Sequence, residues 1–143
     1  AVYTITRSMN NLVRCMNLYR AEQLAPLELK SCHAGYLLEI CACPGISQEQ
    51  LSRRIYANKS NVARQLAALE ESGYVRRSPG EEDRRVMRVY PTEKALAALP
   101  RIQEIMDRWE KVVAGQLSVQ ERERLTALLE DMTCRAAELL EEQ

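Results

Sequence analysis

The sequence predicts a mainly α-helical fold that contains one small β-hairpin, and three observations carry this prediction. Apolar residues recur at helical spacing along most of the chain, and capping residues and Pro-Gly stops divide that pattern into separate helices. Between about residues 74 and 90, two short extended runs on either side of a Pro-Gly turn replace the helical spacing. At 143 residues, 46% of them hydrophobic, the chain is predicted to form a single domain over residues 1–143.

The first two helices are predicted from their apolar stripes and from the residues that end them. Helical spacing runs through residues 4–22 and is broken at Ala25-Pro26. A second helix is expected over residues 31–42, because Pro44-Gly45 stops it there. The chain is therefore expected to begin with one long helix and one short one.

Two further short helices follow, and each has a clear start signal. Ser47 and Gln50 have the spacing of a capping box, and Asn58 is expected to cap the next helix. Gly73 ends that helix, because glycine readily adopts the left-handed backbone that follows a helix. The apolar stripe of the second helix, which should face the core, consists of Val62, Leu66 and Leu69. The residues that then face outward are Ser60, Asn61, Arg64, Gln65 and Ala68.

A two-stranded hairpin is predicted after Gly73. Its strands are expected over residues 74–77 and 85–90, with a turn at residues 79–82. Pro91 ends the second strand, and Thr92 can cap the following helix. The hairpin is therefore expected to stand between the short helices and a long one.

The C-terminal part of the sequence predicts two long helices with continuous apolar stripes. Pro100 lies inside the first and is expected to kink it, because proline lacks a backbone donor. Ser118 and Glu121 form a second capping box and start the last helix. In so small a chain, apolar helices at both ends must pack on its own core or on a partner. We expect a homodimer, with dimerisation helices over residues 1–24 and 92–143.

The order of elements over residues 31–91, two short helices and then a basic hairpin, is that of a winged helix-turn-helix lobe. Although the whole chain has no net charge, residues 45–91 hold nine Lys and Arg against six Asp and Glu. Residues 92–143 are acidic, with seven basic groups against eleven acidic ones. This charge distribution, with a basic middle and an acidic end, favours a protein that binds a phosphate backbone on one face.

The second helix of the pair is then a candidate recognition helix. Arg64 can pair with guanine or reach a phosphate, and Asn61 and Gln65 match the edge of adenine. Residues better placed for phosphates are Gln48, Arg53, Arg54 and Lys59.

Two groups of motifs resemble the MarR family of bacterial regulators. The first is Asp83-Arg84-Arg85, Arg88-Val89 and Thr92-Glu93-Lys94, at the spacing of that family's wing signature. The second is Lys59-Ser60-Asn61-Val62-Ala63-Arg64 with Leu69-Glu70 and Gly73-Tyr74-Val75, which is similar to the family's recognition helix and its exit into the wing. The likeness extends over nearly the whole chain.

The resemblance implies a dimer whose first and last helices interlock. It implies that Arg85 enters the minor groove, held by an ion pair with Asp83. It also implies a sequence-specific repressor of transcription that binds a pseudo-palindromic operator and is released by a small-molecule effector, with small aromatic compounds as the candidate class. The full set of predicted DNA-binding residues is Gln48, Arg54, Lys59, Ser60, Asn61, Arg64, Gln65, Asp83, Arg84, Arg85 and Arg88.

The residues also bear on three other functions. A winged helix can also serve as a protein-interaction module, and salt-sensitive binding to duplex DNA discriminates between the two. An enzyme is not expected, because the chain has one histidine, His33, no recognisable catalytic pair and no glycine-rich phosphate loop. His33 is interpreted as a structural residue. The third alternative is a thiol-based redox-sensing regulator of the same fold.

The five cysteines are Cys15, Cys32, Cys41, Cys43 and Cys134. Their odd number and irregular spacing favour reduced thiols, and burial is the default expectation. Zinc binding is disfavoured because the paired ligand spacing is absent, and no metal or cofactor is predicted. Charges interrupt every apolar stretch, so no membrane span or secretory signal is predicted and a cytoplasmic location is expected.

Overall fold

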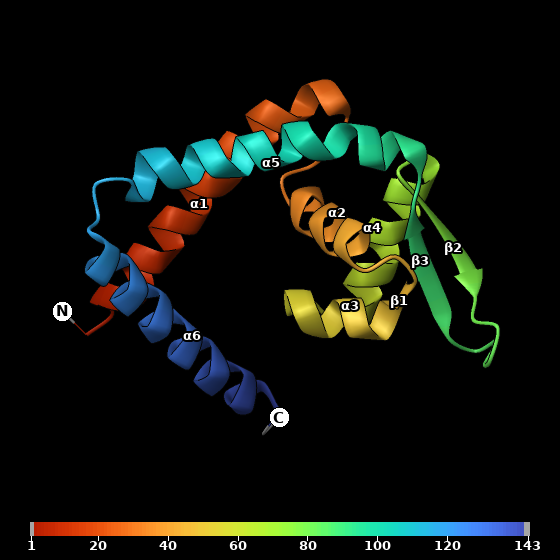
Figure 1. Cartoon of the computed structure of the whole chain (residues 1–143). Coiled ribbons are helices and arrows are strands. Elements are labelled where there is room, and N and C mark those ends of the chain that lie inside the picture. The colour runs from red at the N-terminus through yellow and green to blue at the C-terminus, as the bar shows by residue number, and fades with distance from the viewer. Residues whose placement is uncertain (1, 142–143) are drawn as a thin grey trace. The chain divides into compact units, whose positions relative to one another are not determined.

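The computed structural model describes residues 2–141, which fold mainly into helices (Figure 1). The elements are α1 (Thr4–Leu24), the 3-10 helix η1 (Ala25–Leu27), α2 (His33–Ala42), β1 (Ile46–Ser47), α3 (Gln48–Ile55), α4 (Lys59–Glu71), β2 (Val75–Pro79), β3 (Met87–Pro91), α5 (Glu93–Ala114) and α6 (Val119–Glu141). Two compact units divide the chain between Ile105 and Met106. The first contains the winged helix-turn-helix, and the second contains the end of α5 and all of α6.

Helices α3 and α4 form the helix-turn-helix, and both begin as the sequence predicts. Ser47 accepts a hydrogen bond from the Gln50 backbone N–H at 3.0 Å, and the Gln50 side chain accepts one from the Ser47 N–H at 3.1 Å. The Asn58 side chain accepts from the Asn61 N–H at 2.7 Å. Gly73 follows the end of α4 with a φ of +83°. These local bonds satisfy backbone groups that a helix end leaves open.

The turn between α3 and α4 contains an unusual residue. Tyr56 caps α3 in the left-handed conformation, with φ 56° and ψ 39°, and its side chain is 63% exposed. A side chain with a Cβ is disfavoured in this region, by about 1 kcal/mol or more. Glycine is the residue that helices most often use in this position.

We expect Tyr56→Gly to raise the free energy of unfolding, by roughly 0.5–1 kcal/mol, because the strain is relieved and little buried contact is lost. Chemical denaturation measures this change. Tyr56→Ala is the matched control, since it removes the ring but keeps a Cβ in the left-handed region. Equal destabilisation by both substitutions would show that contacts of the ring outweigh the backbone strain.

The wing is part of a three-stranded antiparallel sheet with the strand order β1-β3-β2. The sequence predicted two strands, and the third is the short β1, in which Ile46 pairs with Val89. Two residues are too few to show the alternation by which a strand is recognised. The short strand joins the base of the wing to the start of α3, so the wing and the helix-turn-helix are one structure.

The tip of the wing differs from the predicted turn. Strand β3 begins at Met87, so Arg85 lies in the loop rather than in a strand. Two backbone hydrogen bonds close this loop, from the Gly80 N–H to the Val86 carbonyl at 2.7 Å and from the Val86 N–H to the Asp83 carbonyl at 3.1 Å. The connection is therefore longer than the residues 79–82 that the sequence indicated.

The core of the first unit lies between the helices and the sheet. The predicted stripe of α4 is buried, with Val62 at 1% exposure and Leu66 and Leu69 at 0%. It is joined by side chains from several elements, namely Leu37 and Ile40 of α2, Leu51 of α3, Val89 of β3 and Ile102 and Ile105 of α5. Tyr74 is also buried, and its hydroxyl donates to the Leu27 carbonyl at 2.6 Å. A stable core thus holds α4 with its opposite face free.

The bounds of the first helices differ slightly from expectation. Helix α1 continues to Leu24, and Ala25-Pro26 lies in η1 instead of breaking the helix outright, because proline is accepted in a first turn. Helix α2 begins at His33, two residues after the predicted start. Helix α5 runs through Pro100 as one continuous helix.

The second unit holds the predicted capping box at the start of α6. The Glu121 N–H donates to the Ser118 hydroxyl at 3.1 Å, and the Ser118 N–H donates to the Glu121 carboxylate at 2.9 Å. Arg122 ties α6 to the end of α5 through Glu110 at 3.0 Å and the Ala114 carbonyl at 2.9 Å. Helix α6 has no buried residue. Within residues 2–141, no helix has the length and apolar character that crossing a bilayer requires.

Candidate nucleic-acid interface

The start of α4 carries an exposed polar face. Ser60 and Arg64 are exposed, and Asn61 is half-buried. The Arg64 guanidinium is 3.4 Å from the Asn61 side-chain oxygen, which is a weak restraint. The Ser60 hydroxyl instead donates to the capping Asn58 at 2.9 Å, so this side chain is partly used by the helix start. Arg64 is therefore the most freely presented side chain of this face.

Gln65 lies on the same helix and is also half-buried. Its amide oxygen points into the lobe. Its oxygen is 2.9 Å from the Nε2 of His33, which is 4% exposed. The His33 Nδ1 accepts a hydrogen bond from the Lys30 backbone N–H at 3.0 Å. The structural role predicted for His33 is confirmed. Its partner on α4, 32 residues away, could not be inferred from local sequence.

Gln48 is held in place at the start of α3. Its side-chain oxygen accepts a hydrogen bond from Arg77 at 3.2 Å. The Arg77 guanidinium and backbone N–H also donate to Glu70, at 3.2 and 3.0 Å, and these bonds lower the pKa of the Glu70 carboxyl. This chain of contacts joins α3, β2 and α4. The roles of Arg77 and Glu70 were not predicted, because Gln48 is 29 residues from Arg77 and the Glu70 contact crosses from α4 into β2.

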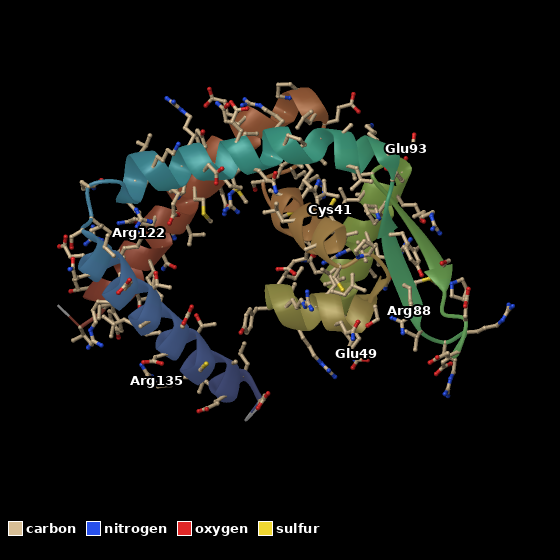
Figure 2. The ribbon with its side chains drawn as sticks, in the orientation of Figure 1. Cys41, Glu49, Arg88, Glu93, Arg122 and Arg135 are labelled. Carbon is tan, nitrogen blue, oxygen red and sulfur yellow. The ribbon has the colours of Figure 1, made fainter. Side chains whose placement is uncertain are left out.

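Three basic residues near α3 form ion pairs at the surface. Arg54 contacts Glu39 at 3.2 Å, and Arg53 and Lys59 both contact Glu49, at 2.9 and 3.6 Å. All these side chains are at least one-third exposed, so the pairs add little stability. They leave the cations accessible to a stronger polyanionic partner. Glu49 is labelled at the lower face of α3 in Figure 2.

The wing tip presents Arg85 almost completely to solvent, with its side chain 91% exposed. Asp83 accepts three hydrogen bonds from this residue, one from its backbone N–H at 3.0 Å and two from its guanidinium at 3.1 and 3.2 Å. These bonds lower the pKa of the Asp83 carboxyl. Arg84 is also exposed. The ion pair between Asp83 and Arg85 that the resemblance implied is present.

Arg88 is placed differently from Arg85. Its guanidinium donates to the Gly45 carbonyl at 2.9 Å, and the contact is partly buried. Figure 2 labels Arg88 on the wing. The neighbouring strand bond, from the Gly45 N–H to the Val89 carbonyl, is 2.8 Å long. Arg88 thus connects β3 to the loop before β1.

The cysteines do not follow the expectation of burial. All five are free. Cys15, Cys32 and Cys134 are exposed, and Cys41 and Cys43 are partly exposed. For Cys15 and Cys134 the expectation failed because cysteine is buried on average, whereas α1 and α6 leave much of their surface uncovered. Desolvation raises the pKa of the Cys32 and Cys41 thiols, which disfavours the reactive thiolate. Residues 2–141 contain no cluster of three or more potential metal ligands.

Comparisons with known proteins bear on the family and the fold of the chain. The model of the MarR family matches residues 36–87. The chain is 26% identical over 125 residues to the uncharacterized HTH-type transcriptional regulator YybA of Bacillus subtilis (strain 168), covering 87% of this chain and 83% of the relative. Its fold is similar to that of the transcriptional regulator SlyA, with 27% identity, a TM-score of 0.90 and 94% coverage of both chains.

A further similar structure contains DNA. It is a MarR-family transcriptional regulator from Listeria monocytogenes complexed with 26mer DNA. The TM-score is 0.89 at 22% identity, with 93% of this chain and 89% of that chain covered. At this identity the likeness is one of fold.

Proposed function

Because the chain belongs to the MarR family of winged helix-turn-helix transcriptional regulators, we propose that it represses transcription from a pseudo-palindromic operator and is released by a small-molecule effector. As a member of this family it is a DNA-binding transcriptional regulator and not an enzyme. The observation that carries the proposal is the two-sided α4, whose buried stripe of Val62, Leu66 and Leu69 leaves Ser60 and Arg64 exposed. A helix held in this way can enter a major groove.

Each predicted site residue has a proposed task. The α4 residues that face the bases are Ser60, Asn61, Arg64 and Gln65. The phosphate contacts come from Gln48, Arg54 and Lys59, and the wing contacts from Arg84 and Arg85 with Asp83 as the support of Arg85. For Arg88 we propose bracing of the wing through Gly45, since its guanidinium is already used there. The Listeria regulator supports this arrangement, because a chain of the same fold was crystallised with DNA.

The proposed assembly is a homodimer. The lobe of about residues 31–91 contacts DNA, and residues 1–24 and 92–143 contact the partner. The support is the exposure of large apolar side chains, with Leu12 of α1 at 53% and Leu125 and Leu129 of α6 at 45% and 43%. Soluble chains rarely leave such stripes open to water. A two-fold dimer would also match the symmetry of a pseudo-palindromic operator.

The repressor and effector parts of the proposal need a cellular test. Duplexes selected by the purified protein identify the operator, which is then placed at a promoter that drives a reporter. We expect lower expression with the regulator present, and recovery when small aromatic acids are added. Higher expression with the regulator present would make it an activator, and no response to any compound would remove the effector from the proposal.

Base reading is tested by comparing Arg64→Ala with Arg54→Ala on the selected operator. If Arg64 contacts a base edge, its loss costs roughly 1–3 kcal/mol and flattens the preference at one position of each half-site. Arg54→Ala is expected to weaken binding to all duplexes alike, because a phosphate contact carries no sequence information. Affinities for the operator and for single-base variants of it measure both effects. Losses that are independent of sequence for both variants would make Arg64 a phosphate anchor only.

A further inference from the structure

We infer that His33 sets the orientation of the Gln65 side-chain amide, so that α4 presents an amide donor to the neighbouring base instead of a paired donor and acceptor. His33 is thus a positioning residue for base preference, although it is buried and would not touch DNA. The inference rests on the proposed placement of α4 in the major groove. It also revises the match between Gln65 and adenine that the sequence suggested.

The hydrogen-bond geometry gives the polarity of the amide. The Lys30 backbone N–H can only donate, and it lies 3.0 Å from the His33 Nδ1. Nδ1 must therefore be the acceptor, so a neutral imidazole carries its proton on Nε2. That Nε2–H donates to the group 2.9 Å away, which must be the amide oxygen of Gln65 and not its nitrogen. The orientation of the amide follows from the backbone of Lys30.

The neutral form of His33 is favoured by its surroundings. Burial lowers the pKa of the imidazole, the hydrogen bond with Gln65 raises it, and the charge of Lys30 lowers it further, with a net decrease. A protonated ring would place an N–H on Nδ1 against the N–H of Lys30. At neutral pH the Nε2 of the ring therefore donates to Gln65 and cannot accept from it.

The consequence for base reading follows from the edges of the bases. The Gln65 oxygen faces the buried His33, which is 4% exposed. Its NH2 group therefore remains for the outer face of α4. That nitrogen is 3.4 Å from the Asn61 side-chain oxygen. The contact is weak, so the amide N–H remains available to donate to DNA. Adenine needs both an acceptor and a donor from an amide, whereas guanine offers two acceptors in the major groove. Gln65 is therefore suited to guanine at its position.

The test measures the base preference of the purified protein on the selected operator and on single-base variants of that operator. The wild type is expected to prefer guanine over adenine at the Gln65 position by roughly threefold to tenfold, the range for one neutral hydrogen bond. Gln65→Met should remove that preference. His33→Leu should free the Gln65 oxygen and shift the preference toward adenine, and His33→Gln, which restores a donor near Nε2, should move it back.

A double variant and a stability control separate positioning from folding. His33→Leu/Gln65→Met should behave as Gln65→Met, because His33 has nothing left to orient. Ile40→Val is the control from the same helix, since it removes buried volume without touching the hydrogen-bond chain. It should leave the base preference unchanged. If His33→Leu only weakens binding to all duplexes equally, as Ile40→Val would, the inference is wrong.

The remaining outcomes are also decisive. If Arg64→Ala and Gln65→Met both leave the selected sequence unchanged, α4 does not read bases and the proposed function fails. If Arg64→Ala flattens its position and the His33 and Gln65 variants flatten none, only this inference fails. Should the His33 variants not fold, the wild type still provides a test, because the chain has a single histidine whose ring-nitrogen NMR signals are unambiguous. A proton on Nδ1 instead of Nε2 would overturn the inference.

Discussion

Replacing Leu125 and Leu129 by aspartate is expected to give a folded monomer that has lost most of its affinity for the operator. Both side chains lie on α6, which buries no residue within the chain, so the first unit should keep its core. Charges in a dimer interface are costly to desolvate. A monomer binds each half-site separately, and the loss of linked binding is on the order of a hundredfold or more. Sedimentation and titration of the full operator measure the two effects.

The matched control for this prediction is Ala127→Asp. Ala127 is exposed on the same helix, about 180° around the axis from the line of the two leucines by helical geometry. It should leave both assembly and affinity unchanged. The dimer proposal is refuted if the wild-type chain sediments as a folded monomer at micromolar concentration. Truncation after Met132 gives a second test, since it should produce monomeric or poorly soluble protein.

Arg85→Ala is expected to weaken operator binding on the order of ten- to a hundredfold, the range for a hydrogen bond made by a charged group. The melting temperature should hardly change, because the Arg85 side chain is 91% exposed and packs against nothing that folding requires. The slope of log affinity against log salt should fall by about one counterion. Binding at several salt concentrations and thermal melting of the free protein test this prediction.

Asp83→Ala should produce a smaller loss than Arg85→Ala. The three hydrogen bonds from Arg85 to Asp83 hold the guanidinium before DNA arrives, so their loss adds ordering cost to binding. The double variant should match Arg85→Ala, since an aspartate that acts only through Arg85 has nothing left to orient. Additive losses, or tighter binding after removal of the negative charge, would show that Asp83 does not position Arg85.

The helix starts of this chain could be predicted because their causes are local. Ser47 with Gln50, Asn58, and Ser118 with Glu121 each satisfy backbone groups within three residues, so spacing along the sequence is sufficient evidence. The buried stripe of α4 was predictable for the same reason, because the helical period determines which side chains share a face. The MarR resemblance added the Asp83–Arg85 pair, which spans only two residues.

The contacts that sequence analysis missed join distant segments. Strand β1 exists because Ile46 meets Val89, and Arg88 reaches a carbonyl 43 residues away at Gly45. Arg77 meets Gln48 across 29 residues. A residue's own neighbours give no sign of such partners. The wrong expectation for the cysteines has a related cause, because average burial of a residue type does not say which helices the chain leaves uncovered.

The sequence by itself determined the order of the α-helices and of the two wing strands, the face of α4 that is buried and the basic character of the lobe, since each follows from local period, capping chemistry and charge. Only the tertiary structure decided how the polar residues of that lobe are aimed. The sequence shows that residue 65 is a glutamine, but only the buried imidazole of His33 turns the glutamine oxygen inward. Arg85 and Arg88 are equally basic, yet one is open to solvent and the other is bound at the base of the wing. The direction of a hydrogen bond depends on the partner that folding brings within reach, and that partner is not encoded nearby in the chain.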